Sequence, residues 1–279
     1  MHANINGNSL LREHGILLSG NASGFDLHFS LDSLSALDAT EDRHFWSVVK
    51  RRLITSLIKR YAPKNDLRIL DVGCGNGGLL MSLERAFPAA FIAGMDGYPQ
   101  ALLHCRKRSA RATLILGDIL HVERIPIAEK FDVVILADVL EHLDEPEKVL
   151  RGIRSILTPR GIVIATVPAS MALWSDRDVF LGHRKRYDRR GLKALFQQSD
   201  FRVLRSNYAF CYLYPPAFFF RKLWSRFGKK SGQKIEESEL REIPVINTLL
   251  RFVGSAEVAL SERIPLPFGT STYCVARLK

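Results

Sequence analysis

Residues 67–78 read LRILDVGCGNGG, an apolar run that carries one acid and passes into four glycines. A short apolar run predicts a buried β-strand, and glycines directly after it predict a tight turn into a helix. Gly73, Gly75 and Gly77 form a G-x-G-x-G pattern, and Gly78 also satisfies the dinucleotide spacing G-x-G-x-x-G. A glycine loop between a strand and a helix indicates a cofactor site, and the loop by itself leaves the class of cofactor open.

Strands and helices alternate on the carboxyl side of this loop. Helical patterns lie at 77–87, 98–108 and 145–157, and apolar strand-like runs at 90–96, 112–118, 131–139 and 161–168. Strands with almost no polar interruption, separated by helices, predict a parallel sheet covered on both faces. The alternating last segment predicts a final antiparallel strand. The expected fold class is therefore α/β, doubly wound and Rossmann-like, with seven mostly parallel strands and an antiparallel last strand.

The chain divides into five parts on composition and periodicity. We expect a loose arm at 1–30, N-terminal helices at 31–63, a cofactor-binding core at 64–210, a basic and aromatic helical insertion at 211–269, and the final strand at 270–279. The helices start after Ser30, an N-cap candidate, and stop at Pro63.

The positive charge lies in one region of the chain. The net charge is +11 overall, but residues 1–170 carry only +1, whereas residues 177–234 carry +12. A solvated basic face, an anionic substrate, an anionic membrane surface and nucleic acid are all consistent with this excess.

Cysteine usage and hydropathy indicate the compartment. The 4 cysteines are scattered without a C-x-x-C pair, which argues against a zinc knuckle or a disulfide framework. The start of the chain lacks a signal-peptide pattern, and no run reaches the ~18 apolar residues of a membrane span. We expect a cytoplasmic protein.

Acids at two further strand ends narrow the choice of cofactor class. Asp96 follows Gly77 by 19 residues, where a carboxylate can accept hydrogen bonds from ribose hydroxyls. Asp118 ends the next strand and can accept from an adenine amine, while Ile119 covers the ring. Each acid alone is equally well explained as a turn or helix cap. Because NAD proteins do not usually need the third acid, the set favours a cofactor with a cationic sulfonium and no pyrophosphate.

These segments together resemble a known family. ILDVGCGNGG, GMDGYPQAL, LGDI, FDVVILADVLEHL and LTPRGIVIATVPA are similar, in this order, to the motifs of class I S-adenosylmethionine-dependent methyltransferases, over about residues 43–205. The resemblance implies a seven-stranded sheet, S-adenosylmethionine as methyl donor and S-adenosylhomocysteine as product. It implies that Gly73 and Gly75 approach the methionine part, Asp96 the ribose, and Asp118 with Ile119 the adenine. The full set of cofactor candidates is Trp46, Asp71, Gly73, Cys74, Gly75, Asp96, Gly97, Asp118, Ile119, Ala137 and Asp138.

The flanks resemble a narrower group of bacterial methyltransferases. EDRHFWSVVKRRLI is similar to that group's first helix, although an arginine is more usual near Val48 than the SVVK found here. LWSDRDVFLGHRKRYDRRGL is similar to the segment after its fifth strand.

Two histidines are candidates for the catalytic base. His142 follows the fourth strand of the core in the E-H-L pattern, and an imidazole titrates near neutral pH. The alternative is that His142 packs over the cofactor or caps a helix, with Glu141 as a structural partner. His183 is the second candidate base. Arg186 and Tyr187 beside it are candidates for binding an anionic acceptor, unless this segment is only a solvated basic lid.

Absent motifs narrow the acceptor. The D/N/S-P-P-Y/F pattern of enzymes that methylate base amines is missing after the fourth strand, and so is a paired-glutamate loop. Oxygen atoms of a small molecule, glycan or lipid-linked acceptor are favoured. No acidic cluster supplies an obvious metal site, so the sequence predicts a reaction without metal.

The segment PPAFFFRKLWSRFGKK (215–230) is amphipathic as a helix. Phe220, Leu223, Trp224 and Phe227 share one face, and basic residues flank it. This arrangement is typical of an interfacial membrane helix, although it is equally explained by packing on the sheet or on 246–254.

Three other functions remain open. The first is a nucleotide-dependent oxidoreductase or epimerase, although this sequence lacks the Y-x-x-x-K pair of such enzymes. The second is a non-catalytic S-adenosylmethionine-binding protein. The third is an RNA methyltransferase, which is consistent with the net charge of +12 over residues 177–234.

Overall fold

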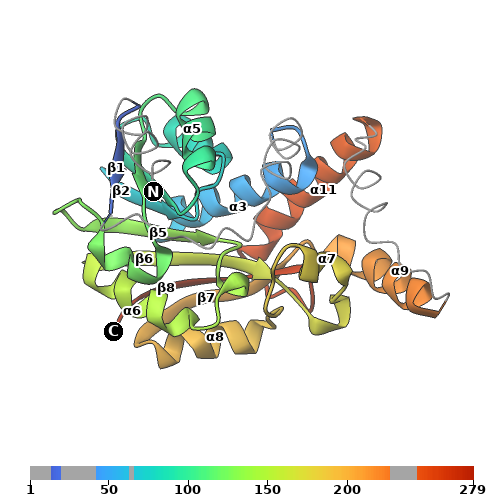
Figure 1. Cartoon of the computed structure of the whole chain (residues 1–279). Coiled ribbons are helices and arrows are strands. Elements are labelled where there is room, and N and C mark those ends of the chain that lie inside the picture. Colours follow the sequence, from blue (N-terminus) through green and yellow to red (C-terminus); the bar gives the residue numbers. More distant parts are fainter. Residues whose placement is uncertain (1–13, 20–41, 63–65, 227–243) are drawn as a thin grey trace, which may run out of the picture.

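A computed structural model describes residues 14–19, 42–62, 66–226 and 244–279. One sheet runs through these ranges in the order β1-β4-β3-β2-β5-β6-β8-β7 (Figure 1). All neighbours from β1 to β6 are parallel, and β8 is antiparallel to both β6 and β7. The strands are β1 Ile16–Leu18, β2 Arg68–Val72, β3 Phe91–Asp96, β4 Thr113–Leu116, β5 Phe131–Ala137, β6 Leu157–Pro168, β7 Phe201–Ala209 and β8 Ser271–Leu278.

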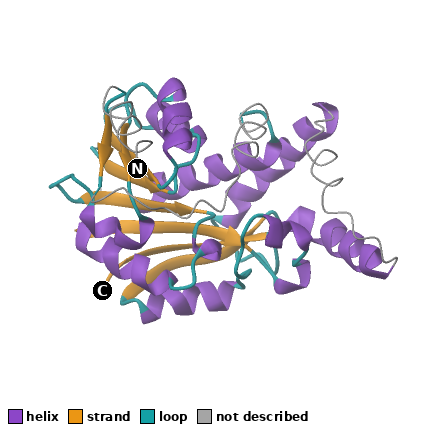
Figure 2. Cartoon of the chain, in the orientation of Figure 1, coloured by secondary structure: helices purple, strands orange, loops and turns teal. Residues whose placement is uncertain are grey.

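Helices cover both faces of this sheet (Figure 2). They are α3 Phe45–Tyr61, α4 Gly78–Ala86, α5 Pro99–Arg108, α6 Pro146–Ile156, α7 Asp176–Phe180, α8 Arg189–Gln198, α9 Tyr214–Arg226 and α11 Pro244–Ser261. Within the described residues, 3₁₀ turns lie at η1 Ile119–Arg124, η2 Leu140–His142, η3 Met171–Leu173 and η4 Cys211–Leu213. None of the helices in the described ranges is both long and apolar enough to cross a bilayer.

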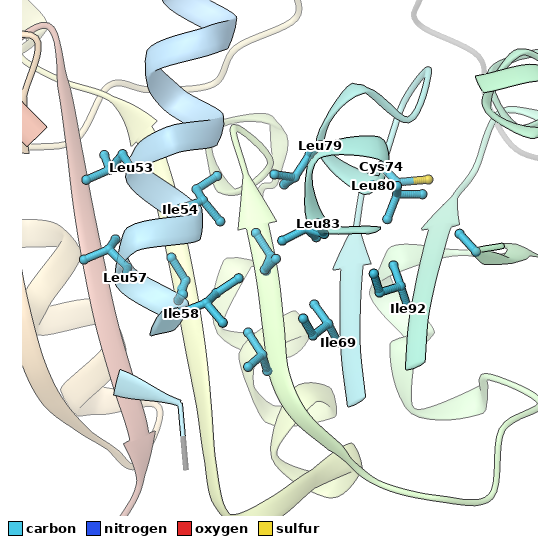
Figure 3. Packing of buried hydrophobic residues seen from close by; sticks show 14 of the residues in the cluster. Leu53, Ile54, Leu57, Ile58, Ile69, Cys74, Leu79, Leu80, Leu83 and Ile92 are labelled. Carbon is cyan, nitrogen blue, oxygen red and sulfur yellow. The ribbon is translucent and has the colours of Figure 1, made fainter. Parts of the chain in front are cut away.

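Two hydrophobic clusters hold the layers together. Residues of α3, α4 and α5 form one cluster, and residues of α6 and α8 form the other. Figure 3 shows side chains of α3 and α4, such as Leu57 and Leu80, gathered with Ile69 of β2 and Ile92 of β3. Leu57 is fully buried, and burying a side chain of this size stabilises the fold by about 1.5–3 kcal/mol. This packing holds the loop after β2 against the sheet.

The α/β class and the antiparallel last strand are confirmed, but the expected number of seven strands is wrong. The eighth strand is β1, which lies within the segment expected to be a loose arm. It pairs in parallel with β4, and its Ile16 is buried. Three residues are too few to show a period in the sequence, so the free edge of β4 decides this strand.

The segment before the core is described only in part. The expected N-cap at Ser30 and the helix after it lie outside the described residues, whereas α3 begins at Phe45 within the range expected to be helical. The helical insertion contains α9 and α11, and the chain then returns to the sheet as β8, between β6 and β7.

Candidate active site

The glycine loop after β2 adopts backbone angles that favour glycine. Gly73 has φ of +78° and Gly75 of +50°, both in the left-handed region. A Cβ atom on Gly73 would stand 2.6 Å from Cγ2 of Val139, so a side chain there would collide with the segment after β5. Cys74 in the loop and Asp71 on β2 are buried. α4 begins at Gly78, directly after the loop, and the N–H groups of its first turn have no carbonyl partner within the helix.

Asp96 at the end of β3 is joined to this loop. Its carboxylate accepts hydrogen bonds from the backbone N–H groups of Gly75 and Tyr98, both at 2.9 Å, and from that of Gly97. Burial raises the pKa of Asp96, and these donors partly oppose that shift. Two carboxylate oxygens offer about four lone-pair sites, so acceptor capacity remains for ribose hydroxyls. The fold therefore brings two of the sequence-predicted strand ends together.

Asp118 and Ile119 follow the next strand of the same edge. Oδ1 of Asp118 accepts a hydrogen bond of 2.8 Å from the N–H of Leu120 and so caps η1. Both residues are half-buried. Asp118 therefore does cap a helical turn, which is the alternative explanation for an acid at this position. A contact of Asp118 with adenine stays a prediction.

Lys50 is a site residue that sequence reasoning missed. It lies on α3, forms an ion pair with Asp138 after β5, and stands 5.4 Å from the ring centre of Trp46. Trp46 stacks on Phe210 with ring centres 4.1 Å apart. Lys50 lies four residues after Trp46, on the same face of the helix, and this spacing is the signal that could have found it. Ala137 ends β5 directly before the paired Asp138.

The structure brings His142 and His183 together from segments far apart in the chain. Their ring centres are 4.8 Å apart and the rings are nearly perpendicular. Burial and then the neighbouring His183 lower the pKa of His142 to about 4. His142 is therefore a neutral imidazole at neutral pH, and its affinity for a proton is weak.

Asp178 holds His183 in place, and sequence reasoning did not select it. Oδ1 of Asp178 lies 2.9 Å from Nδ1 of His183 and 2.7 Å from Nε of Arg186. Burial alone would raise the pKa of Asp178, but the hydrogen bonds from His183 and Arg186 hold it well below its usual value. The ionised Asp178 favours the proton on Nδ1 of His183 and leaves Nε2 as an acceptor. The signal was the S-x-x-D capping box that Ser175 begins.

Arg186 and Tyr187, the two expected acceptor-binding residues, are fixed by hydrogen bonds within the protein. Arg186 also donates to the carbonyl oxygen of Ala169, at 3.3 Å, and its side chain is 9% exposed. Tyr187 is buried, and its hydroxyl donates to the carbonyl oxygen of Leu140. Burial raises the pKa of Tyr187. Contact of either residue with an acceptor stays a prediction.

Glu141 is fully buried between the two histidines and the core. No other described residue donates a hydrogen bond to its carboxylate oxygens. Burial first, and then the charge of Asp138, raise the pKa of Glu141 well above its ordinary value. One donor atom each of Glu141, His142 and His183 lie within 4.8 Å of one another, a spacing that could hold a metal ion. The expectation of a reaction without metal stays a prediction.

Glu141→Gln should remove a loss of stability at alkaline pH. A carboxyl group whose pKa is raised on folding binds more protons in the folded than in the unfolded chain, so stability falls as pH rises above the ordinary pKa. We expect the variant to melt at a higher temperature than the wild type at pH 8 and at nearly the same temperature at pH 5. Thermal melts at the two pH values test this, and an equal difference at both would contradict it.

A cavity of about 730 Å³ lies beside the histidine pair's loop. Arg186 and Tyr187 line it together with Ser170, Tyr208, Tyr214 and Phe268. The hydroxyl groups of Ser170 and Tyr214 are 3.2 Å apart. None of the predicted cofactor residues lines this cavity. The cavity therefore shares no lining residue with the glycine loop or with the acids at the strand ends.

Known proteins are similar to this chain in sequence and in fold. A family model described as a methyltransferase domain matches residues 45–206. The chain is 34% identical over 110 residues to the ubiquinone biosynthesis O-methyltransferase of Neisseria meningitidis serogroup C, covering 38% of this chain and 46% of that protein. It is 30% identical over 175 residues to the malonyl-[acyl-carrier protein] O-methyltransferase of Halalkalibacterium halodurans, covering 58% and 65%.

A solved structure shares the fold over nearly the whole chain. The plantazolicin methyltransferase BpumL, solved with S-adenosylhomocysteine, aligns with a TM-score of 0.58 and 15% identity over 99% of this chain and 98% of that one. The alignment with the first curated relatives is shorter, because this chain spans 37–46% of their length. The family match by itself covers residues 45–206, more than half of the 279 residues, and the chain belongs to the methyltransferase domain family.

Proposed function

We propose that this protein transfers a methyl group from S-adenosylmethionine to an oxygen atom of a small-molecule, glycan or lipid-linked acceptor. The observation that carries the proposal is the edge where β4, β3, β2 and β5 end side by side. Gly73, Asp96 and Asp118 follow one another along this edge, and Asp96 is hydrogen-bonded into the glycine loop. Two curated relatives are named as O-methyltransferases.

The residues at this edge fit S-adenosylmethionine. A Cβ atom on Gly75 would meet nothing within 4 Å, so the space beside the loop is open at this residue. Asp96 retains acceptor capacity for ribose hydroxyls, and Lys50 on α3 offers a cation for the methionine carboxylate. When bound, the cofactor supplies a methyl group on a sulfonium, which is already a good electrophile. The protein's own task is to position the acceptor and remove its proton.

The Asp178–His183 pair supplies the base in this proposal. Asp178 accepts the hydrogen bond from Nδ1 of His183, so Nε2 of His183 takes the proton of the acceptor hydroxyl as the oxygen is methylated. His142 remains neutral beside it, because its pKa is about 4. A neutral imidazole there can accept a hydrogen bond from the acceptor or pack against it.

The 730 Å³ cavity is the proposed acceptor cavity, because Arg186, which shares Asp178 with His183, lines it and links it to the base. Its tyrosines and Phe268 suit an apolar or aromatic body, and Lys185 with Arg186 suit an anionic group on it. A lipid-linked acceptor would place the protein at the inner face of the cell membrane, as a cytoplasmic protein with peripheral contact. All 4 cysteines are free, which agrees with a reducing compartment. Exposed Phe219 and Phe220 of α9 support contact through 215–230, whereas the side chains of residues 222–230 lie outside the described residues.

A mass-spectrometric screen tests the proposed function. The protein is incubated with S-adenosylmethionine carrying a labelled methyl group and with a pool of hydroxylated aromatic, glycan and lipid extracts. We expect a product that gains one labelled methyl group together with S-adenosylhomocysteine, and much less product from the Asp96→Ala variant when S-adenosylmethionine is limiting. Methylation of RNA alone would favour the RNA methyltransferase, and cofactor binding without any methylated product would favour the non-catalytic binding protein.

A further inference from the structure

Helix α11 is amphipathic in the opposite sense to an ordinary surface helix. The side that faces the protein buries Asn247, Gly254, Val258 and Ser261, of which only Val258 is a large apolar residue. Asn247 accepts a hydrogen bond from the N–H of Phe45 and donates one to the carbonyl oxygen of Arg43. Polar and small residues therefore attach α11 to α3.

The outward side of α11 is apolar. Val245 is 78% exposed, Leu249 59% and Phe252 74%, and their spacing of four and three residues places them in one stripe along the helix. A surface helix normally turns such a stripe to the core. An exposed apolar stripe of this kind marks a site of contact with another apolar phase.

A pocket lies between α3 and α11, beside this stripe. It has a volume of about 350 Å³ and is lined by Val48, Arg52, Thr248, Arg251, Phe252 and Ser255. Arg52 donates a hydrogen bond to Oγ of Ser255, so the two helices are joined at the pocket. The guanidinium groups of Arg52 and Arg251 are donors that can bind phosphate. The hydroxyl groups of Thr248 and Ser255 already donate to the carbonyl oxygens of Pro244 and Arg251.

We propose that α11 and the adjoining edge of α3 form a docking surface for an anionic phospholipid leaflet. Val245, Leu249 and Phe252 enter the acyl boundary, and the Arg52–Arg251 pocket holds a lipid phosphate. An apolar helix face flanked by arginine is the composition of an interfacial helix. The stripe lies on the convex outer side of a helix, which suits insertion into a bilayer better than the grasp of a protein partner.

The position of α11 fits this partner. Its amino-terminal end lies on the same side of the molecule as α7 and α9, away from the chain's carboxyl end (Figure 1). Phe219 and Phe220 of α9 and Phe180 of α7 are also exposed there. Docking through α11 would bring this side toward the bilayer. The docking surface rests on the proposed function only for its biological purpose, which is to bring a lipid-linked acceptor close to the active site.

Vesicle co-sedimentation of the full chain tests the surface. Vesicles of phosphatidylcholine alone are compared with equimolar phosphatidylcholine and phosphatidylglycerol. We expect binding that rises with phosphatidylglycerol, falls with salt, and is lost in Leu249→Glu with Phe252→Glu. Arg52→Ala with Arg251→Ala should bind roughly 30-fold more weakly, at about 1 kcal/mol for each cation. The matched control Arg160→Ala, which removes an exposed cation of β6 between the paired residues Leu157 and Ile162, should bind nearly as the wild type does.

Two outcomes would overturn the proposal, and the state of the cofactor site is read separately. If the wild-type protein stays in the supernatant at low salt, the proposal that this surface binds a membrane is rejected. Binding that survives the α11 variants but is lost in Phe219→Glu with Phe220→Glu would move the surface to α9. Calorimetric titration with S-adenosylmethionine should be unchanged in every α11 variant, which also shows that they fold. Vesicle binding without any cofactor binding by the wild type would leave this surface standing and reject the proposed function.

Discussion

Asp96→Ala should weaken the binding of S-adenosylmethionine by about 1.5–3 kcal/mol, roughly 10- to 150-fold, which is the scale of losing hydrogen bonds to a charged group. The carboxylate has two roles in the structure. It accepts the N–H groups of Gly75 and Tyr98, which shapes the glycine loop, and it retains acceptor capacity on the side where a ribose would lie. Isothermal titration calorimetry with S-adenosylmethionine measures the change.

Two variants separate these roles. Asp96→Asn keeps an acceptor oxygen of the same shape, so it should preserve the loop better than alanine while weakening the hydrogen bonds to ribose. Asp118→Ala should cost less affinity, because one amine contact is at stake and Oδ1 of Asp118 already caps η1. Unchanged affinity of Asp96→Ala would remove Asp96 from the cofactor site.

His183→Ala should lower turnover by about 10²–10⁴-fold, the usual contribution of a general base, with S-adenosylmethionine binding nearly intact. The physical reason is the hydrogen bond from Nδ1 of His183 to the ionised Asp178, which orients Nε2 as the proton acceptor. His142→Ala is the matched control on the neighbouring ring. Because the pKa of His142 is about 4, we expect its removal to lower turnover less. The release of S-adenosylhomocysteine with the acceptor found in the screen is the measurement.

Asp178 should act on turnover through His183, as a positioning residue. Asp178→Asn keeps the shape of the side chain but removes the charge that fixes the proton on Nδ1. We expect turnover to fall, because the ring of His183 is then no longer held with Nε2 as the proton acceptor, while the cofactor affinity stays the same. A larger loss from His142→Ala than from His183→Ala, or full turnover in Asp178→Asn, would return the role of base to His142.

The local pattern of the sequence predicted most of the core. The apolar runs at 90–96 and 131–139 correspond to β3 and β5, and the helical pattern at 145–157 corresponds to α6. These elements are long enough to show their period, and each is buried where the pattern is apolar. β1 could not be found in the same way, because three residues pair only where β4 offers a free edge.

The candidate site divides along the same line. Gly73, Asp96 and Asp118 were predictable because parallel strands end at one edge of a sheet, so acids at successive strand ends must lie together. Lys50 and Asp178 carry only local signals, the spacing from Trp46 and the S-x-x-D capping box. Their pairing with Asp138 and His183 is seen only in the folded chain.

The sequence by itself determined the α/β class, the position of the glycine loop and the order of the acids, since these depend on periodicity and on glycine's freedom at positive φ. Only the tertiary structure decided which histidine is oriented by a carboxylate, that Glu141 is buried with a raised pKa, and that α11 turns its apolar side outward. The physical reason is that charge state and exposure depend on neighbours in space. A helical pattern shows that one face is apolar, but it does not show which way that face points.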